Sequence, residues 1–227
     1  MTKVRTTTLV FLLCICSSLV LSQGKQDKND ELKALANKVD EHYNGLKSLR
    51  SQFHESYSGM GMSRRESGML YLKKPGRMRW EYQTPREKLF VSDGKTAWFY
   101  VPGEQQARRA PVSKIDDIRS PLRFLLGKTK LLKEFRELSF SSSLKPLNPG
   151  NFVLRGVPKG MEDRISMVTL EVSPGGRIDR ITMEEVDGAT TDFIFSQEQE
   201  NVPVADNLFK FQPPRGVEIV EAKELGN

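Results

Sequence analysis

The sequence predicts a mostly β protein of the α+β class: an incomplete, strongly curved antiparallel β-barrel of about eleven strands, with an N-terminal helix and a short helical lid. Two observations predict the sheet. Apolar residues alternate with polar ones with a period of two after Ser51, and turn pairs such as Asp93-Gly94 separate the alternating segments. A third observation, an apolar period of three to four residues before Ser51, predicts the helix.

Composition restricts the class of protein. The chain has 227 residues, 35 Lys and Arg against 29 Asp and Glu, a formal charge of +6 and 37% hydrophobic residues. It is too charged for a membrane helix bundle and too apolar to be wholly disordered, and its length fits one domain. The basic excess is small and forms no long stripe, so we expect no nucleic-acid partner.

The first residues are typical of a secretory signal peptide. Lys3 and Arg5 precede an apolar run from Leu9 to Cys16, and Ser22 supplies a small residue for cleavage, so we expect residues 1–22 to be removed. Residues 23–30 are expected to form a flexible lead-in. Neither cysteine of the run follows a small residue, as a lipidated cysteine would, so the mature chain is expected to be exported, without cysteine or lipid anchor. A signal that stays uncleaved as a membrane anchor is the alternative.

An amphipathic helix of about five turns is expected next, with Asp30 as its N-cap. Its apolar positions recur at intervals of three and four: Leu32, Leu35, Val39, Tyr43, Leu46 and Leu49.

The strands fill most of the remaining chain, and we expect residues 31–221 to form one half-barrel with a tail at 222–227. Alternation predicts strands around residues 51–57, 66–73, 77–82, 89–91, 96–101, 137–141, 151–157, 165–173, 177–186, 190–198, 208–211 and 217–221. The segment Gly103–Asp117 receives no assignment. Within residues 120–127, serine at the start, proline in the first turn and glycine at the end predict a short helix rich in leucine.

Residues with catalytic or metal-binding chemistry are sparse. The histidines are His42 and His54, the mature chain lacks cysteine, and no nucleophile motif occurs, so we expect no metal, no cofactor and no enzyme. Gly94-Lys95-Thr96 resembles the end of a phosphate loop, but it lies at a strand turn and the earlier glycine is missing.

Large apolar side chains gather on one face of the predicted sheet. A two-residue turn at Pro75-Gly76 would pair Tyr71 with Trp80 and Met69 with Tyr82, and Met78 would share their face. The same reasoning across Asp93-Gly94 pairs Phe90 with Ala97, places Phe99 on that face, and turns Trp98 and Tyr100 to the other. Such a concave face encloses either a packed core or a ligand cavity, and periodicity alone favours the core.

Three blocks in order resemble the LolA family of periplasmic lipoprotein carriers, over most of residues 31–220. They are Gly68-x-Leu70-x-Leu72-Lys73-Lys74-Pro75 with Met78-x-Trp80-x-Tyr82-x-x-Pro85, then Val91-Ser92-Asp93-Gly94-Lys95-Thr96-x-Trp98-Phe99-Tyr100-x-Pro102, and finally Phe209-x-Phe211-x-Pro213-Pro214-x-Gly216-Val217.

The resemblance implies a monomeric periplasmic chaperone. It would bind acylated lipoproteins released by an inner-membrane ABC-type complex and pass them to a LolB-like outer-membrane receptor. The acyl chains would occupy an apolar cavity, and the residues expected to line it or its lid are Met69, Tyr71, Met78, Trp80, Tyr82, Phe90, Phe99, Leu122, Leu125 and Leu126.

In the family an arginine directly before the proline of the first block holds the lid by hydrogen bonds to its backbone. Lys74 occupies that position and would be the latch, with a single ammonium in place of a planar guanidinium. A regulatory or lipid-sensing module on the same scaffold is the alternative to a carrier.

Overall fold

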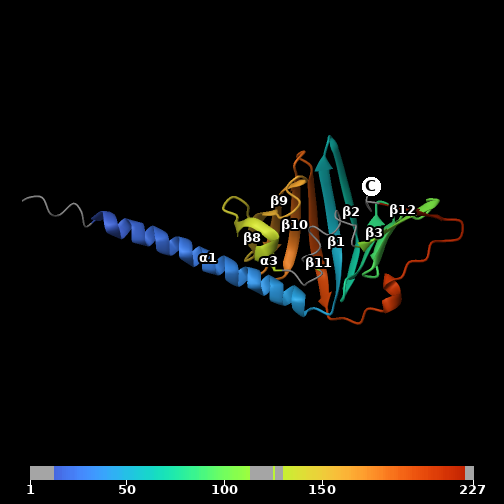
Figure 1. The fold of residues 1–227 in the computed structure, drawn as a ribbon, viewed down its shortest axis with the longest axis horizontal. Coiled ribbons are helices and arrows are strands. Elements are labelled where there is room, and N and C mark those ends of the chain that lie inside the picture. Colours follow the sequence, from blue (N-terminus) through green and yellow to red (C-terminus); the bar gives the residue numbers. More distant parts are fainter. Residues whose placement is uncertain (1–12, 113–124, 126–129, 223–227) are drawn as a thin grey trace, which may run out of the picture.

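The computed structural model describes residues 13–112, 125 and 130–222, and a twelve-stranded sheet dominates it (Figure 1). Two short helical elements, α3 (Leu131–Glu134) and the 3-10 turn η2 (Asp206–Phe209), accompany the long helix α1 (Leu13–Gly45). The strands are β1 (Ser48–Gly59), β2 (Met62–Lys73), β3 (Arg77–Thr84), β4 (Lys88–Ser92), β5 (Thr96–Tyr100), β6 (Gln106–Pro111), β7 (Phe135–Phe140), β8 (Phe152–Pro158), β9 (Ile165–Val172), β10 (Ile178–Glu185), β11 (Thr190–Glu200) and β12 (Glu218–Glu221).

The sheet is open, and its strand order is β12-β6-β5-β4-β3-β2-β1-β11-β10-β9-β8-β7. Every neighbouring pair is antiparallel except β12 and β6, which run parallel. Because β12 and β7 remain as two separate edges, the barrel is incomplete, and the predicted fold class is confirmed.

Two segments differ from the predicted strands. The strand β6 lies inside Gly103–Asp117, where short alanines and exposed arginines obscure the alternation, although Ala107 and Ala110 are fully buried. The strand expected at 208–211 is wrong: residues 208–209 complete η2, which places the Phe209 ring in the core, and residues 210–211 continue as irregular chain.

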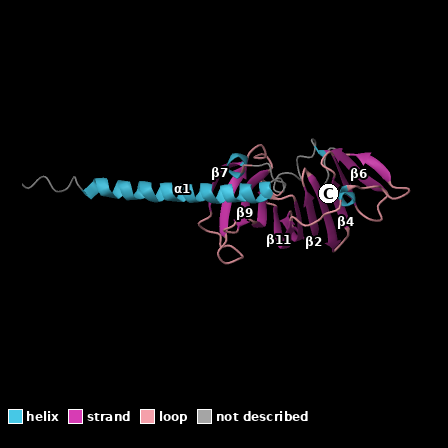
Figure 2. Cartoon of the chain, turned by 90° about the horizontal axis from the view of Figure 1, so that it is seen from below, coloured by secondary structure: helices cyan, strands magenta, loops and turns pink. Residues whose placement is uncertain are grey.

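Helix α1 is longer than predicted, and its first half extends beyond the sheet while its second half lies along it (Figures 1 and 2). The polar residues 23–30 are helical rather than irregular, since nothing after Gly24 in that stretch disfavours a helix. Asp30 therefore lies inside the helix, where its carboxylate accepts hydrogen bonds from Gln26 and pairs with Lys33, and its predicted role as N-cap is wrong.

The C-terminal half of α1 packs on the sheet through the predicted apolar positions. Leu32, Leu35, Val39 and Tyr43 are all buried in the main hydrophobic cluster. The helix ends at Gly45, so Leu46 belongs to the connection and Leu49 to β1, earlier than the periodicity predicted. Among the described residues, no helix is both long and apolar enough to cross a membrane.

The predicted register of β2 and β3 is wrong by one residue. Lys73 pairs with Arg77, so the connection has three residues, and Leu70 rather than Tyr71 lies opposite Trp80. The amide of Lys74 donates to the carbonyl of Lys47 at 3.0 Å instead of continuing the β2–β3 ladder. Because side chains alternate between faces, this shift moves Met69 and Tyr71 to the face opposite Trp80.

The register of β4 and β5 differs by two residues, which preserves the faces. Phe90 pairs with Phe99, and Ala97 pairs with Ser92, so these residues share a face as predicted. Trp98 and Tyr100 lie on the opposite face, where their rings contact Phe211. The tight turn between the strands packs against the β2–β3 turn, and a side chain on Gly94 (φ +93°) would approach the Pro75 carbonyl oxygen to 3.1 Å.

Candidate functional site

The face of the sheet that α1 covers, here called the inner wall, carries a continuous apolar surface. Alternate residues of the central strands point to it and are buried: Leu49, Phe53, Leu70, Leu72, Met78, Trp80, Phe90, Phe193 and Phe195. Strand alternation therefore builds one apolar surface from segments more than a hundred residues apart.

An aromatic cluster forms the centre of the inner wall. The Trp80 ring lies 4.6 Å from Phe53, 5.6 Å from Phe193 and 6.3 Å from Phe195, measured between ring centroids. The indole Nε1–H of Trp80 is buried and meets no acceptor among the described groups. Buried donors are normally paired, so this unpaired donor marks a position where an incoming acceptor would be stabilised.

One end of the inner wall is closed by a contact between the β2–β3 turn and the end of α1. The Lys74 ammonium donates to the carbonyl oxygens of Tyr43 at 2.6 Å and Asn44 at 2.7 Å. These carbonyls belong to the last helical turn, where no further intrahelical amide is available and the helix dipole is negative. The Lys74 ammonium therefore supplies hydrogen-bond donors to these carbonyls and a positive charge to the negative end of the helix dipole.

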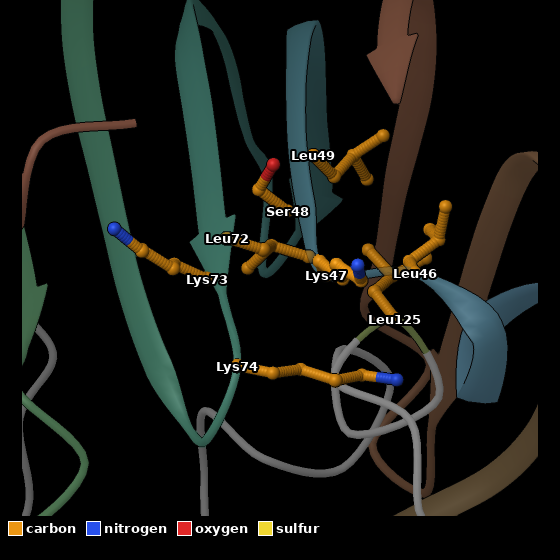
Figure 3. Close-up of a pocket in the computed structure, with 8 residues that line it drawn as sticks. All are labelled: Leu46, Lys47, Ser48, Leu49, Leu72, Lys73, Lys74 and Leu125. Carbon is orange, nitrogen blue, oxygen red and sulfur yellow. The ribbon is translucent and has the colours of Figure 1, made fainter. Parts of the chain in front are cut away.

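A small apolar pocket lies beside this contact, lined by Leu46, Leu49, Leu72 and Leu125 together with Lys74 (Figure 3). Lys73 and Lys74 point in opposite directions, and Lys74 extends toward the end of α1 (Figure 3). The volume of the pocket is about 10 Å³, which is room for no more than one water molecule. A ligand larger than water can enter at this point only if α1 and the turn separate.

Helix α1 is also attached to the other half of the sheet. The Ile178 amide donates to the Tyr43 hydroxyl oxygen at 2.9 Å, and the Leu131 amide donates to the Asp40 carboxylate at 2.9 Å. Together with its apolar contacts, these bonds join α1 to β10 and α3. Lys74, in contrast, joins it to the β2–β3 turn.

A buried carboxylate lies near this attachment. Glu198 stands on the inner wall next to Arg177, whose Nε is 3.8 Å from Glu198 Oε2, and burial raises the pKa of Glu198 to about 7. Asp179 and Glu200 raise the pKa further, while Arg177 lowers it. Burial also lowers the pKa of His42, which lies 3.4 Å from Glu200.

The opposite end of the inner wall is polar. Glu55 accepts a hydrogen bond from the Tyr82 hydroxyl at 2.8 Å, and Glu66 pairs with Lys88 at 2.7 Å and with Arg64 at 2.9 Å. Burial raises the pKa of the Glu55 carboxyl and of the Tyr82 phenol. The apolar part of the wall thus ends at a network of paired charges.

The structure separates the residues that were expected to line a cavity. Met78, Trp80 and Phe90 lie together on the inner wall, and Phe99 continues the same row beyond Phe90. Tyr82 lies at the polar end, where it donates to Glu55. Met69 and Tyr71 lie on the outer face, where Tyr71 lines a surface pocket of about 350 Å³. Leu125 is buried beside Lys74, whereas Leu122, Leu126 and the rest of the predicted lid helix lie outside the described residues.

Sequence reasoning missed half of the wall. Phe53, Phe193 and Phe195 surround Trp80, yet the pairing arguments stopped at adjacent hairpins. The alternation of Leu49, Phe53 and Glu55 along β1 carried the signal for their face. The contact of Phe193 and Phe195 with Trp80 depends on the pairing of β1 with β11, which no turn predicts.

The family profile described as "Outer membrane lipoprotein carrier protein LolA" matches residues 44–212. The chain belongs to the LolA family. The match includes the inner wall and Lys74, and it confirms the resemblance noted in the sequence.

Curated relatives of this LolA-family chain carry the same description. The outer-membrane lipoprotein carrier protein of Nitrosomonas europaea is 25% identical over 220 residues, which cover 94% of this chain and 98% of that protein. The corresponding protein of Nitrosospira multiformis is 31% identical over 157 residues, 68% of this chain and 72% of that one. The LolA family is one of carriers rather than enzymes.

A solved structure agrees on the fold. An uncharacterized conserved protein from Thermus thermophilus superimposes with a TM-score of 0.54 at 13% identity, covering 83% of this chain and 98% of that one.

The structure explains why the first family block contains a glycine at position 68. A side chain at Gly68 would overlap the carbonyl oxygen of Glu81 at the bulge between β2 and β3.

Proposed function

We propose that this LolA-family protein is exported to the periplasm and carries lipoproteins by binding their acyl chains against the inner wall. It would receive them from an inner-membrane ABC-type complex and deliver them to an outer-membrane receptor. The family match supports cargo of this class, and the apolar inner wall supplies a surface of the right chemistry.

The observation that carries the proposal is the closure of an apolar wall by a contact that is easily broken. Each buried CH₂ group contributes about 0.8 kcal/mol, so an acyl chain must be covered throughout its passage through water. Lys74 joins α1 to the sheet through two hydrogen bonds from one flexible side chain. Such a closure holds the empty protein shut yet opens when a long apolar ligand supplies the energy.

Two further features support a lipid ligand. Leu125 places one residue of the predicted lid segment in the pocket beside Lys74. The unpaired Trp80 Nε1–H lies in the middle of the wall, where the ester carbonyl of an acyl chain is the acceptor that this ligand class offers.

The test is direct binding. Protein purified from the periplasm is mixed with a triacylated lipopeptide and passed over a sizing column in buffer without detergent, with the deacylated peptide as control. The proposal expects co-elution of the acylated peptide alone, with a rise in Tm as ligand binds the native state. If the acylated peptide never co-elutes, the proposed carrier function is wrong.

A further inference from the structure

The tip of the β1–β2 hairpin is an exposed apolar point at the end of the sheet away from Lys74. Met60 and Met62 are 79% and 63% exposed, the highest values among large hydrophobic side chains in the described part of the chain. The hairpin projects beyond its neighbours, as the teal strands in Figure 1 show. Two methionines with their side chains in water are unfavourable for an isolated soluble protein.

The backbone conformation of this turn is a second reason why methionine is unfavourable at position 60. Gly59 pairs with Met62, which leaves Met60 and Gly61 as a two-residue turn in which both have positive φ, +52° and +74°. Such hairpin turns favour asparagine or aspartate before glycine, because a residue with a bulky side chain is strained in the left-handed region. Met60 therefore occupies a site where Asn would be both better folded and better hydrated. A methionine at a position where it lowers both stability and solubility points to a functional role.

The neighbouring turn extends the apolar point. Ser58 pairs with Thr190, and Gly59 packs on Ala189, so the β10–β11 turn lies directly beside the tip. Val186 in that turn is 58% exposed. The charges nearby are mixed: Arg65 is exposed, Arg64 is paired with Glu66, and Asp187 accepts a hydrogen bond from the Ala189 amide.

We propose that this tip, Met60 and Met62 with Val186 beside them, inserts shallowly into the surface of a phospholipid bilayer. A two-residue turn is far too narrow for the roughly 1,200 Å² that a stable protein interface buries. Membrane insertion needs no complementary pocket, because its strength follows the apolar area that is buried. Basic residues nearby add attraction to anionic lipid. Unbranched methionine side chains adapt to a fluid environment.

The tip is separate from the inner wall, so its test does not depend on the proposed carrier function. Vesicles of phosphatidylcholine, with or without phosphatidylglycerol, are floated with protein purified from the periplasm. We expect Met60→Asn combined with Met62→Ser to weaken vesicle binding about tenfold or more. Leu147→Ser, which removes an exposed leucine on the β7–β8 connection, is the matched control and should bind as the unaltered protein does.

Two additional measurements make the test specific. Met60→Asn alone should leave Tm unchanged or higher, which separates loss of membrane binding from misfolding. A photoreactive residue at position 60 should label phospholipid, and one at position 147 should not. Vesicle binding that survives the double substitution overturns the proposal. So does labelling at position 60 of a protein, or of a second copy of this chain, without labelling of lipid.

Lipopeptide binding in the absence of vesicles should be the same for the double variant and the unaltered protein. A variant that loses both activities would contradict the separation of the tip from the inner wall. A failure of the carrier proposal alone leaves vesicle binding in place.

Discussion

Lys74 and Lys73 are neighbours with opposite surroundings. Lys73 points outward and pairs with Asp206 at 2.6 Å, whereas Lys74 donates to the last carbonyls of α1. Alternation along β2 ends at Lys73, and the three-residue turn directs Lys74 inward. The sequence block marked the position, and only the turn geometry assigned its partner.

The Lys74 contact predicts a change in cargo kinetics. Lys74→Met should destabilise the folded protein by about 1 kcal/mol, because two helix-end carbonyls lose their donor, and should speed lipopeptide release. Lys74→Arg should slow release, since a guanidinium holds two acceptors in a fixed geometry. Release is measured by transfer of a fluorescent lipopeptide to acceptor vesicles, with Lys73→Met as the control. If the unaltered protein and the three variants release the lipopeptide at the same rate, Lys74 has no role in cargo release.

Glu198 predicts a pH dependence of stability. Its pKa is about 7 in the folded protein against 4.5 for a free glutamate, so the folded state holds the proton more tightly than the unfolded state. The penalty for ionising the buried group is absent below pH 4.5, grows as pH rises, and is complete above about pH 7.

Glu198→Gln should therefore raise the free energy of unfolding at pH 8 by about 3 kcal/mol and change it little at pH 4. Urea unfolding at both pH values measures this. The difference between the two proteins isolates the effect of Glu198, because every other ionisable group is the same in both. A stabilisation that is the same at pH 4 and pH 8 would contradict the assignment.

At the scale of elements, register decides which residues form the inner wall. Met69 and Tyr71 were expected beside Trp80, and one additional turn residue places them on the outer face. Across β4 and β5 the shift is two residues, so the prediction for Phe90 and Phe99 survives. An odd error in turn length exchanges the faces and an even one does not.

This difference in face predicts different effects of one substitution. Phe90→Glu or Met78→Glu should reduce lipopeptide binding below detection, because a carboxylate would lie among acyl chains. Tyr71→Glu, on the outer face of β2, should bind as the unaltered protein does. Far-UV circular dichroism verifies folding, and the milder Phe90→Ala, also expected to bind weakly, serves if Phe90→Glu fails to fold. Strong binding by both inner-wall variants would contradict the proposed site.

At the scale of the whole molecule, the open sheet leaves two edges to protect. The β6 edge is covered by β12. The amides of Glu218 in β12 and of Ala222 directly after it donate to the carbonyls of Gln105 and Arg109, both at 2.8 Å. Exposed edges pair with other chains, so β12 is expected to keep the protein from self-association.

Val220→Pro tests this role. Alternation along β12 directs the Val220 amide toward β6, so the substitution removes one hydrogen bond to that edge, whereas Ile219→Pro leaves the bonding amides in place. We expect Val220→Pro to increase self-association measured by sedimentation velocity, with Ile219→Pro as the control. A monomer in both variants would contradict the protective role of β12.

The sequence alone determined the class of fold, the strand-rich order after Ser51, the amphipathic half of α1 and the family blocks. These follow from periodicity and turn chemistry, which act between neighbours in the chain. Tertiary structure alone decided the pairing of β1 with β11, the partners of Trp80, the end of α1 at Lys74 and the raised pKa of Glu198. Each of these depends on residues brought together from distant segments, where burial and contact, rather than local preference, set the energy.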